Sequence, residues 1–129
     1  MAQPAAKQGD QITATDIHII IPPDGGSRSV PHPFAGPLSE SLSADVKIMG
    51  LPAATVGSVA RNSPPHIPQG GSFQTPPTNR GTILRGSTTV MINGKPAARN
   101  GDQAQTCADP SPNTGAKVVV SGGTVMIGG

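Results

Sequence analysis

The sequence predicts an all-β protein: a small conical fold of short β-hairpins around a pseudo-threefold axis, connected by long Pro/Gly-rich loops. Three observations predict it. Apolar residues rich in Val and Ile occur in short bursts, Pro or Gly interrupts nearly every window long enough for a helix, and one strand-like motif recurs three times. The 129 residues are about one domain long, so we expect a single domain over 1–129.

The recurring motif is a strand of the form Val-x-Ile that runs into glycine. Its copies are Val46–Gly50, Val90–Gly94 and Val125–Gly128. The alternation places two β-branched residues on one face of each strand. In the second copy, Asn93-Gly94 is typical of a tight hairpin turn, because both residues tolerate positive φ.

A Pro-Ala-Ala tripeptide follows the first two copies, at Pro52–Ala54 and Pro96–Ala98. Proline suits the start or the edge of a strand, and the small alanines let neighbouring hairpins approach closely. Three such hairpins around one axis enclose a narrow, tapering interior that small aliphatic side chains can fill.

The segments between the copies are expected to be loops. Pro22–Pro37 and Asn62–Gly81 each carry many prolines, which favour an extended and pre-ordered backbone. The best helix candidate is a turn or two around Leu38 to Ala44.

The composition limits what such a chain can do. Trp and Tyr are absent and only two Phe are present, so a conventional large core is out of reach. Glycine and proline number 17 and 15, which a disordered chain would also show, but the net charge of +2 is too low for disorder driven by charge. Without a basic stripe or aromatic residues for base stacking, nucleic acid is not expected as a partner.

No apolar run approaches the ~20 residues of a membrane span, and the start "MAQPAAKQGDQ" lacks the hydrophobic segment of a secretory signal. We therefore expect synthesis in the cytoplasm and export, if any, by another route. A lone cysteine excludes an internal disulfide.

The residues able to bind a metal are three histidines and one cysteine: His18, His32, His66 and Cys107. Three imidazoles and a thiolate form a sensible tetrahedral zinc set, and a closed site would contribute folding free energy to a chain with little core. Their spacing matches no C-x-x-C or H-x-x-x-H pattern, so solvated histidines with a buried thiol remain an alternative.

Catalytic alternatives have less support. A Cys–His nucleophile would need an orienting Asp or Asn and an oxyanion motif, and neither is recognisable. Asp10 and Asp102 follow glycines and are typical of turns. Arg99 either pins a carbonyl or carboxylate at a repeat boundary or is an exposed cation.

The stretch "GKPAARNGD" resembles the signature of PAAR-repeat proteins, with Pro-Ala-Ala-Arg at Pro96–Arg99, and "GLPAATVG" is a degenerate copy with Thr55 in place of arginine. The segments "PHPFAG", "NSPPHIP" and "TCADP" are similar to those of longer PAAR-like variants from extracellular contractile injection systems and phage-like tails. The resemblance covers essentially the whole chain.

The resemblance implies a small cone, without enzymatic activity, that caps a trimeric β-helical spike of the VgrG-like or gp5-like kind. The base would bind the spike, and the point would lead membrane puncture in transient contact with the target membrane. The protein would be part of a contractile injection particle, released or cell-associated. Alternatives are an adaptor that recruits effector cargo, although no effector segment is expected after the third strand, and a small metallohydrolase.

The resemblance also implies a structural metal at the point, usually zinc, with iron as a second possibility. Its ligands would be His18, His32, His66 and Cys107. His32 lies in a Pro-rich segment, and a water or backbone oxygen is the alternative in its place.

Overall fold

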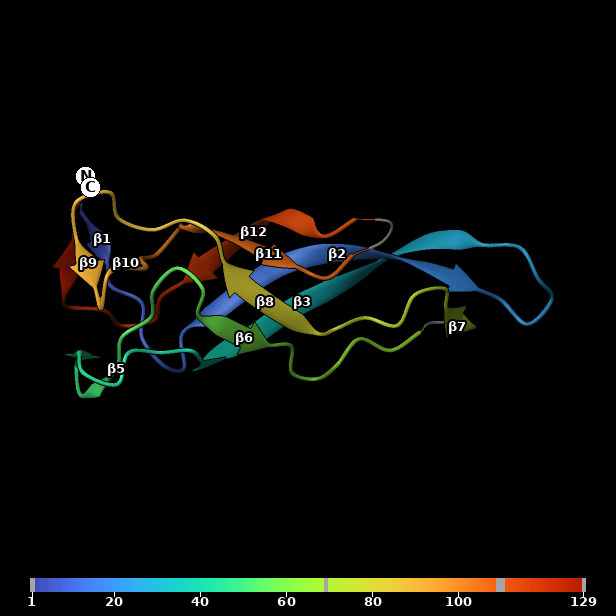
Figure 1. The fold of residues 1–129 in the computed structure, drawn as a ribbon. Helices are drawn as coiled ribbons and strands as arrows, with labels where there is room; N and C mark the ends of the chain where they lie inside the picture. Colours follow the sequence, from blue (N-terminus) through green and yellow to red (C-terminus); the bar gives the residue numbers. More distant parts are fainter. Residues whose placement is uncertain (1, 69, 109–110, 129) are drawn as a thin grey trace.

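An antiparallel barrel forms the middle of the molecule, and a smaller three-part base closes one end of it (Figure 1). The computed structural model describes residues 2–68, 70–108 and 111–128. The barrel strands, in order around the barrel, are β2 (Gln11–Ile21), β3 (Arg28–Glu40), β6 (Val59–Arg61), β8 (Arg80–Ile83), β11 (Gln103–Thr106) and β12 (Asn113–Val119). Strand β12 pairs back onto β2 and closes the barrel. The predicted all-β class is confirmed.

The base consists of three two-stranded pairs. They are β4 (Lys47–Ile48) with β5 (Leu51–Pro52), β9 (Met91–Ile92) with β10 (Lys95–Pro96), and β13 (Met126–Ile127) with β1 (Gln3–Pro4). The three predicted Val-x-Ile copies each contain one of these strands. Each pair aligns an inward isoleucine with the residue just before a proline.

The third pair is built from the two ends of the chain, which lie side by side in Figure 1. The predicted third Val-x-Ile copy, Val125–Gly128, contains β13, but its partner strand β1 was not predicted. Pro4-Ala5-Ala6-Lys7 is a third Pro-Ala-Ala copy that precedes its Val-x-Ile strand in sequence instead of following it.

Backbone hydrogen bonds join the three copies around an axis. Ala6 N–H donates to Ala98 O, Ala98 N–H to Ala54 O, and Ala54 N–H to Ala6 O, with N···O distances of 2.9, 3.0 and 3.0 Å. The same turn follows each tripeptide. In it, a backbone N–H donates to the side chain three residues later: Lys7 to Asp10, Thr55 to Ser58, and Arg99 to Asp102. The pseudo-threefold symmetry therefore extends to individual hydrogen bonds.

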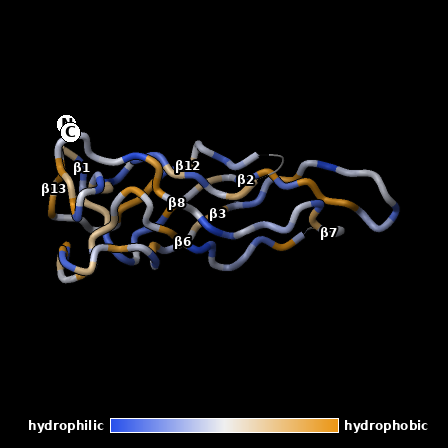
Figure 2. The backbone as a smooth tube through the Cα atoms, viewed as in Figure 1, coloured by the Kyte–Doolittle hydropathy of each residue, from blue (hydrophilic) through white to orange (hydrophobic). Residues whose placement is uncertain are grey.

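Two small cores stabilise this arrangement. The base core consists of alanines and isoleucines from all three copies: Ala5, Ile48, Ala53, Ile92, Ala97 and Ile127. The barrel core contains the largest fully buried side chains, among them Phe34, Ile12, Leu38 and Ile83. Glycine at position 81 makes room for this core, since a Cβ there would lie 3.2 Å from the Phe34 ring and 3.3 Å from Ile12. Figure 2 shows hydrophobic backbone stretches at the end that carries β1 and β13.

Two sequence-based expectations are wrong. Most of the expected loop Pro22–Pro37 belongs to the long strand β3, which pairs with β2 over ten residues from Arg28↔Ile20 to Pro37↔Gln11. The helix candidate around Leu38 to Ala44 is not helical: its first residues complete β3, and residues 41–44 are bends and irregular backbone.

The prolines fit β3 because of the direction in which they face. The backbone polar groups of Ala35 point away from β2: its N–H donates to Asn62 Oδ1, and its carbonyl accepts from Ser63 N–H. By the alternation of strands, Pro31 and Pro33 face the same outer edge, where β2 needs no N–H donor. Proline is therefore compatible with the β2–β3 ladder.

The ends of β2 and β3 extend beyond the barrel, away from the base, to a turn at residues 22–27 (Figure 1). The short strand β7 (Ser72–Phe73) pairs with the end of β2 there. No described helix has the length and apolarity that a bilayer crossing requires.

Candidate metal centre

The inward faces of β2 and β3 bring polar side chains into the barrel at the end farther from the base. Along β2 the inward positions are Ile12, Ala14, Asp16, His18 and Ile20, and burial alternates accordingly. His32 is the register partner of Asp16 on β3. Three polar residues thus share one sheet face, next to Phe34 of the barrel core.

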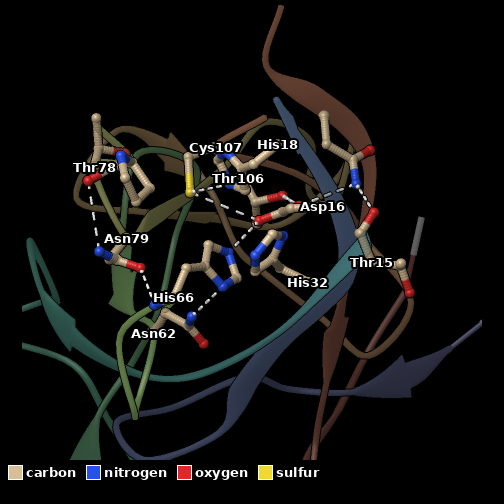
Figure 3. Close-up of polar contacts among 12 residues, drawn as sticks. Thr15, Asp16, His18, His32, Asn62, His66, Thr78, Asn79, Thr106 and Cys107 are labelled. Atoms are coloured by element: carbon tan, nitrogen blue, oxygen red, sulfur yellow. Dashed lines mark hydrogen bonds and ion pairs between the residues drawn. The ribbon is translucent and has the colours of Figure 1, made fainter. Parts of the chain in front are cut away.

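His66 and Cys107 reach the same place from other segments. His66 follows β6 and Cys107 follows β11 directly. One ligand atom from each of Asp16, His18, His66 and Cys107 lies within 4.8 Å of all the others. Figure 3 shows these side chains and His32 gathered around one point.

The Asp16 carboxylate is completely buried, and its two oxygens have different partners. Oδ1 accepts from Thr106 Oγ1 at 2.5 Å and from Asn113 Nδ2 at 3.2 Å. Oδ2 lies 3.1 Å from His66 Nε2 and 3.7 Å from Cys107 Sγ. The sequence analysis did not single out Asp16, although its place two residues before His18 in an alternating strand would have put it on the same face.

His66 is held from both sides of its ring. Asn62 Oδ1 accepts from Ala35 N–H, so its amide nitrogen faces His66 Nδ1 at 3.1 Å. Nδ1 is therefore an acceptor, and Nε2 carries the hydrogen that is donated to Asp16. The backbone N–H of His66 donates to Asn79 Oδ1 at 2.8 Å.

His32 lies beside these residues but faces backbone oxygens. Its Nδ1 is 2.9 Å from Val30 O, and its Nε2 is 3.1 Å from Ile67 O. Its ring centroid is 5.3 Å from those of His18 and His66. The structure thus brings all four sequence-predicted residues together, while the group of converging ligand atoms contains Asp16 instead of His32.

Both phenylalanines of the chain pack against the imidazoles. Phe73 lies edge-on to His18, with ring centroids 5.4 Å apart, and contacts His32 at 5.5 Å. Phe34 approaches His66 at 6.0 Å from the barrel side. Two apolar rings therefore flank the cluster, and they lower the local dielectric and strengthen interactions between charges.

One side of the cluster is open to solvent. A pocket of about 440 Å³ is lined by His18 and Cys107 together with Pro76, Pro77 and Arg80. The Cys107 thiol is partly buried, and this burial is the main reason that its pKa is raised. A hydrogen bond with the Asn79 backbone lowers the pKa, while the charge of Asp16 raises it further. The pocket thus borders the partly buried thiol.

The donor set suits a transition metal of borderline softness. Imidazole, thiolate and carboxylate are the three ligand types of protein zinc sites. Four-coordinate zinc with bonds of about 2.0–2.3 Å places its ligand atoms roughly 3–4 Å apart. The contacts of 3.1 and 3.7 Å made by Asp16 Oδ2, and the 3.7 Å from Cys107 Sγ to His18 Nε2, match that spacing. The buried Asp/His/His/Cys group can hold a metal ion.

These features define a class: a small all-β protein with a three-hairpin base and, at the other end of its barrel, a buried group of side chains that can hold a metal ion. Residues 73–129 match the family model of the PAAR motif. The chain therefore carries a PAAR motif in this segment, which supports a PAAR-repeat protein of the kind associated with contractile injection systems. A comparison with curated proteins gave no match. The copies at Pro4–Lys7 and Pro52–Thr55 lie outside the matched segment but form the same turns.

Proposed function

We propose that this protein is the tip of the spike of a contractile injection system. Its base would cap the blunt end of a trimeric, VgrG-like β-helical spike, and its far end would meet the target membrane first. The protein acts mechanically in this proposal and catalyses no reaction. It would reach the outside as part of the particle.

The observation that carries the proposal is the ring of hydrogen bonds among Ala6, Ala54 and Ala98. Through this ring, one chain presents three equivalent hairpins around an axis. A trimeric spike presents three equivalent strand ends, so a single copy of this chain matches all three at once. Exposed strand edges pair readily with other strands, and main-chain hydrogen bonds of this kind would resist an axial load.

The surface of the base adds apolar contact area. Met91 and Met126, at equivalent positions of their pairs, are 59% and 54% exposed. Leu51 and Met49 of the remaining pair are 39% and 49% exposed. Exposed apolar residues gathered at one end of a small protein are typical of a binding surface.

Substitutions in the base test this function. Leu51→Glu, Met91→Glu and Met126→Glu each place a charge on one of the three pairs, and we expect each to weaken binding to the trimeric spike protein of the same injection system by about tenfold or more. The matched control is Ile67→Glu, which alters a 61% exposed side chain near the metal centre and should bind normally. Unchanged affinity in all three base variants, measured by light scattering or a pull-down, would refute the proposal.

We further propose that the bound metal is zinc and that its role is structural. His18, His66 and Cys107 belong both to the set implied by the family resemblance and to the converging group, and the fourth ligand is considered below. A closed site would join β2, the segment after β6 and the segment after β11, which are distant in sequence. Elemental analysis should find one zinc per chain, and Cys107→Ser should lose the zinc and lower the melting temperature together.

Cargo recruitment remains a second role that a tip could have, and the fold defines how to test it. Removal of the whole segment Pro22–Pro37 would destroy strand β3, so a deletion has to stay within the turn at residues 22–27. Retention of a co-purifying effector after this short deletion would exclude the turn as the cargo site.

A further inference from the structure

We infer that the fourth metal ligand is Asp16 and that His32 serves instead as a strut between two backbone segments. This inference rests on the proposed metal-bound tip and specifies its ligands. It departs from the set of three histidines and one cysteine that the resemblance implies.

The first argument is the different environment of the two Asp16 oxygens. Thr106 Oγ1 and Asn113 Nδ2 hold Oδ1 and so fix the plane of the carboxylate. Oδ2 is left facing His66 Nε2 and Cys107 Sγ. Metal-binding carboxylates are commonly oriented in this way by hydrogen bonds to the oxygen that does not bind. Asp16 is thus preorganised to offer one oxygen to the cluster.

The second argument is the position of His32. Both of its ring nitrogens lie near carbonyl oxygens, at 2.9 Å from that of Val30 and 3.1 Å from that of Ile67. A neutral imidazole has one N–H, so only one of these contacts is a hydrogen bond, but both nitrogens are directed at backbone oxygens and neither belongs to the converging group of ligand atoms. In this orientation His32 connects strand β3 to the segment that carries His66.

The third argument is charge. Asp16 and His18 are 0% and 1% exposed, and two phenylalanine rings flank the cluster. Uncompensated charge in such a place is unfavourable. The sum of the ionic charges is zero in both arrangements, but only coordination by Asp16 places the carboxylate in direct contact with the ion. With His32 as the ligand, the cation with one thiolate and the Asp16 anion would remain separate buried charges.

X-ray absorption of the zinc-loaded wild-type protein tests this without any mutation. We expect two imidazoles, one oxygen and one sulfur around the zinc. Three imidazoles with one sulfur would overturn the inference.

Two variants give an independent test by Zn²⁺ and Co²⁺ titration. Asp16→Asn keeps the shape of the side chain and should weaken binding by more than about 100-fold, beyond the effect of a residue that only supports a ligand. His32→Gln should stay within about threefold of the wild type, since a strut leaves the ligand set intact. Circular dichroism of the metal-free proteins establishes that both are folded. Unchanged affinity in Asp16→Asn would overturn the inference, and if both variants lose affinity, the imidazole count decides.

Failure here is distinguishable from failure of the proposed function. A wild-type chain that binds neither Zn²⁺ nor Co²⁺ would overturn the ligand assignment, whereas spike capping is judged by the Leu51, Met91 and Met126 variants at the opposite end of the molecule. Three imidazoles around the zinc would leave both the metal-bound tip and the capping function standing.

Discussion

Lys7 and Asp10 form a buried ion pair that holds distant parts of the chain together. The Lys7 ammonium lies 2.9 Å from Asp10 Oδ2 and also donates to Ser121 O at 3.3 Å. Asp10 Oδ1 accepts from Ser121 N–H at 3.2 Å. The pair therefore connects the first Pro-Ala-Ala copy to the segment before β13, in addition to closing its own turn.

Asp10→Asn should destabilise the protein by about 3 kcal/mol or more, because it leaves the Lys7 charge buried without its partner. Urea unfolding followed by circular dichroism measures the change. The matched control is Glu40→Gln, which breaks an exposed pair with Arg61 whose side chains are 36% and 58% exposed. An exposed pair contributes at most about 1 kcal/mol, so equal losses in the two variants would contradict this account.

Asn62 and Asn113 both contact side chains of the metal centre, Asn62 a histidine and Asn113 a carboxylate. Asn62 Nδ2 faces His66 Nδ1. A metal-bound histidine usually donates its second N–H to an oxygen, preferably of a carboxylate, and an amide nitrogen cannot accept it. Asn113 Nδ2 instead donates to Asp16 Oδ1 and to Thr15 O.

The same substitution at these two positions should therefore have opposite effects. Asn62→Asp keeps an acceptor for Ala35 N–H and offers a second oxygen to His66 Nδ1, so Zn²⁺ should bind about tenfold more tightly. Asn113→Asp places a second carboxylate against Asp16 Oδ1 and should weaken Zn²⁺ binding or leave a less stable protein. Competition with a chromogenic chelator measures both affinities, and a change of the same sign in the two variants would disprove the argument.

Among the elements, the hairpin turns of the base depend on left-handed backbone. Asn93 and Gly94 have φ of 52° and 78°, and Met49 and Gly50 have φ of 53° and 83°. The first pair was predicted from its residue types. The second was not, because methionine is a poor residue for positive φ.

Gly94→Ala should cost about 1 kcal/mol, since a Cβ disfavours positive φ although nothing within 4 Å would obstruct it. Gly128→Ala is the control, because Gly128 also has open space around its Cβ position but is not among the positive-φ residues. Thermal unfolding should separate the two variants by several degrees. Similar melting temperatures would show that the turn conformation does not limit stability.

The sequence revealed elements whose signals are local. Val-x-Ile alternation located β4, β9 and β13, and the family signature located Pro96–Arg99. Strand β3 was missed because prolines were read as loop residues, and only pairing shows that Pro31 and Pro33 lie on the edge that faces away from β2. Asp16 was missed because its role depends on which side chains the closed barrel places opposite it.

At the scale of the whole molecule, the protein has two differently stabilised ends. The base is held by alanine and isoleucine packing and by the ring of backbone hydrogen bonds. The other end is held by polar side chains and two phenylalanine rings around the candidate metal centre. The proposed spike binding and metal binding thereby fall in separate regions, so each can be altered independently.

The third hairpin of the base offers the strongest test of the symmetry. Its strands β1 and β13 are joined by pairing alone, whereas the other two pairs are each closed by a tight turn. If the three pairs are equivalent, the fold should not depend on which of them contains the N- and C-terminal strands.

A circular permutant that connects residue 129 to residue 1 through a short glycine linker and opens the chain between Gly50 and Leu51 should therefore fold. The new ends would lie in the turn between β4 and β5, where β1 and β13 already show that pairing holds such a hairpin together without a turn. Differential scanning calorimetry should place its melting temperature within a few degrees of the wild type, with the same zinc content and the same affinity for the spike. The control permutant uses the same linker but opens β2 between Ile12 and Thr13, inside the ladders with β3 and β12, and should fail to fold. Failure of both permutants would mean that the three pairs are similar in shape but that their order along the chain is required for folding.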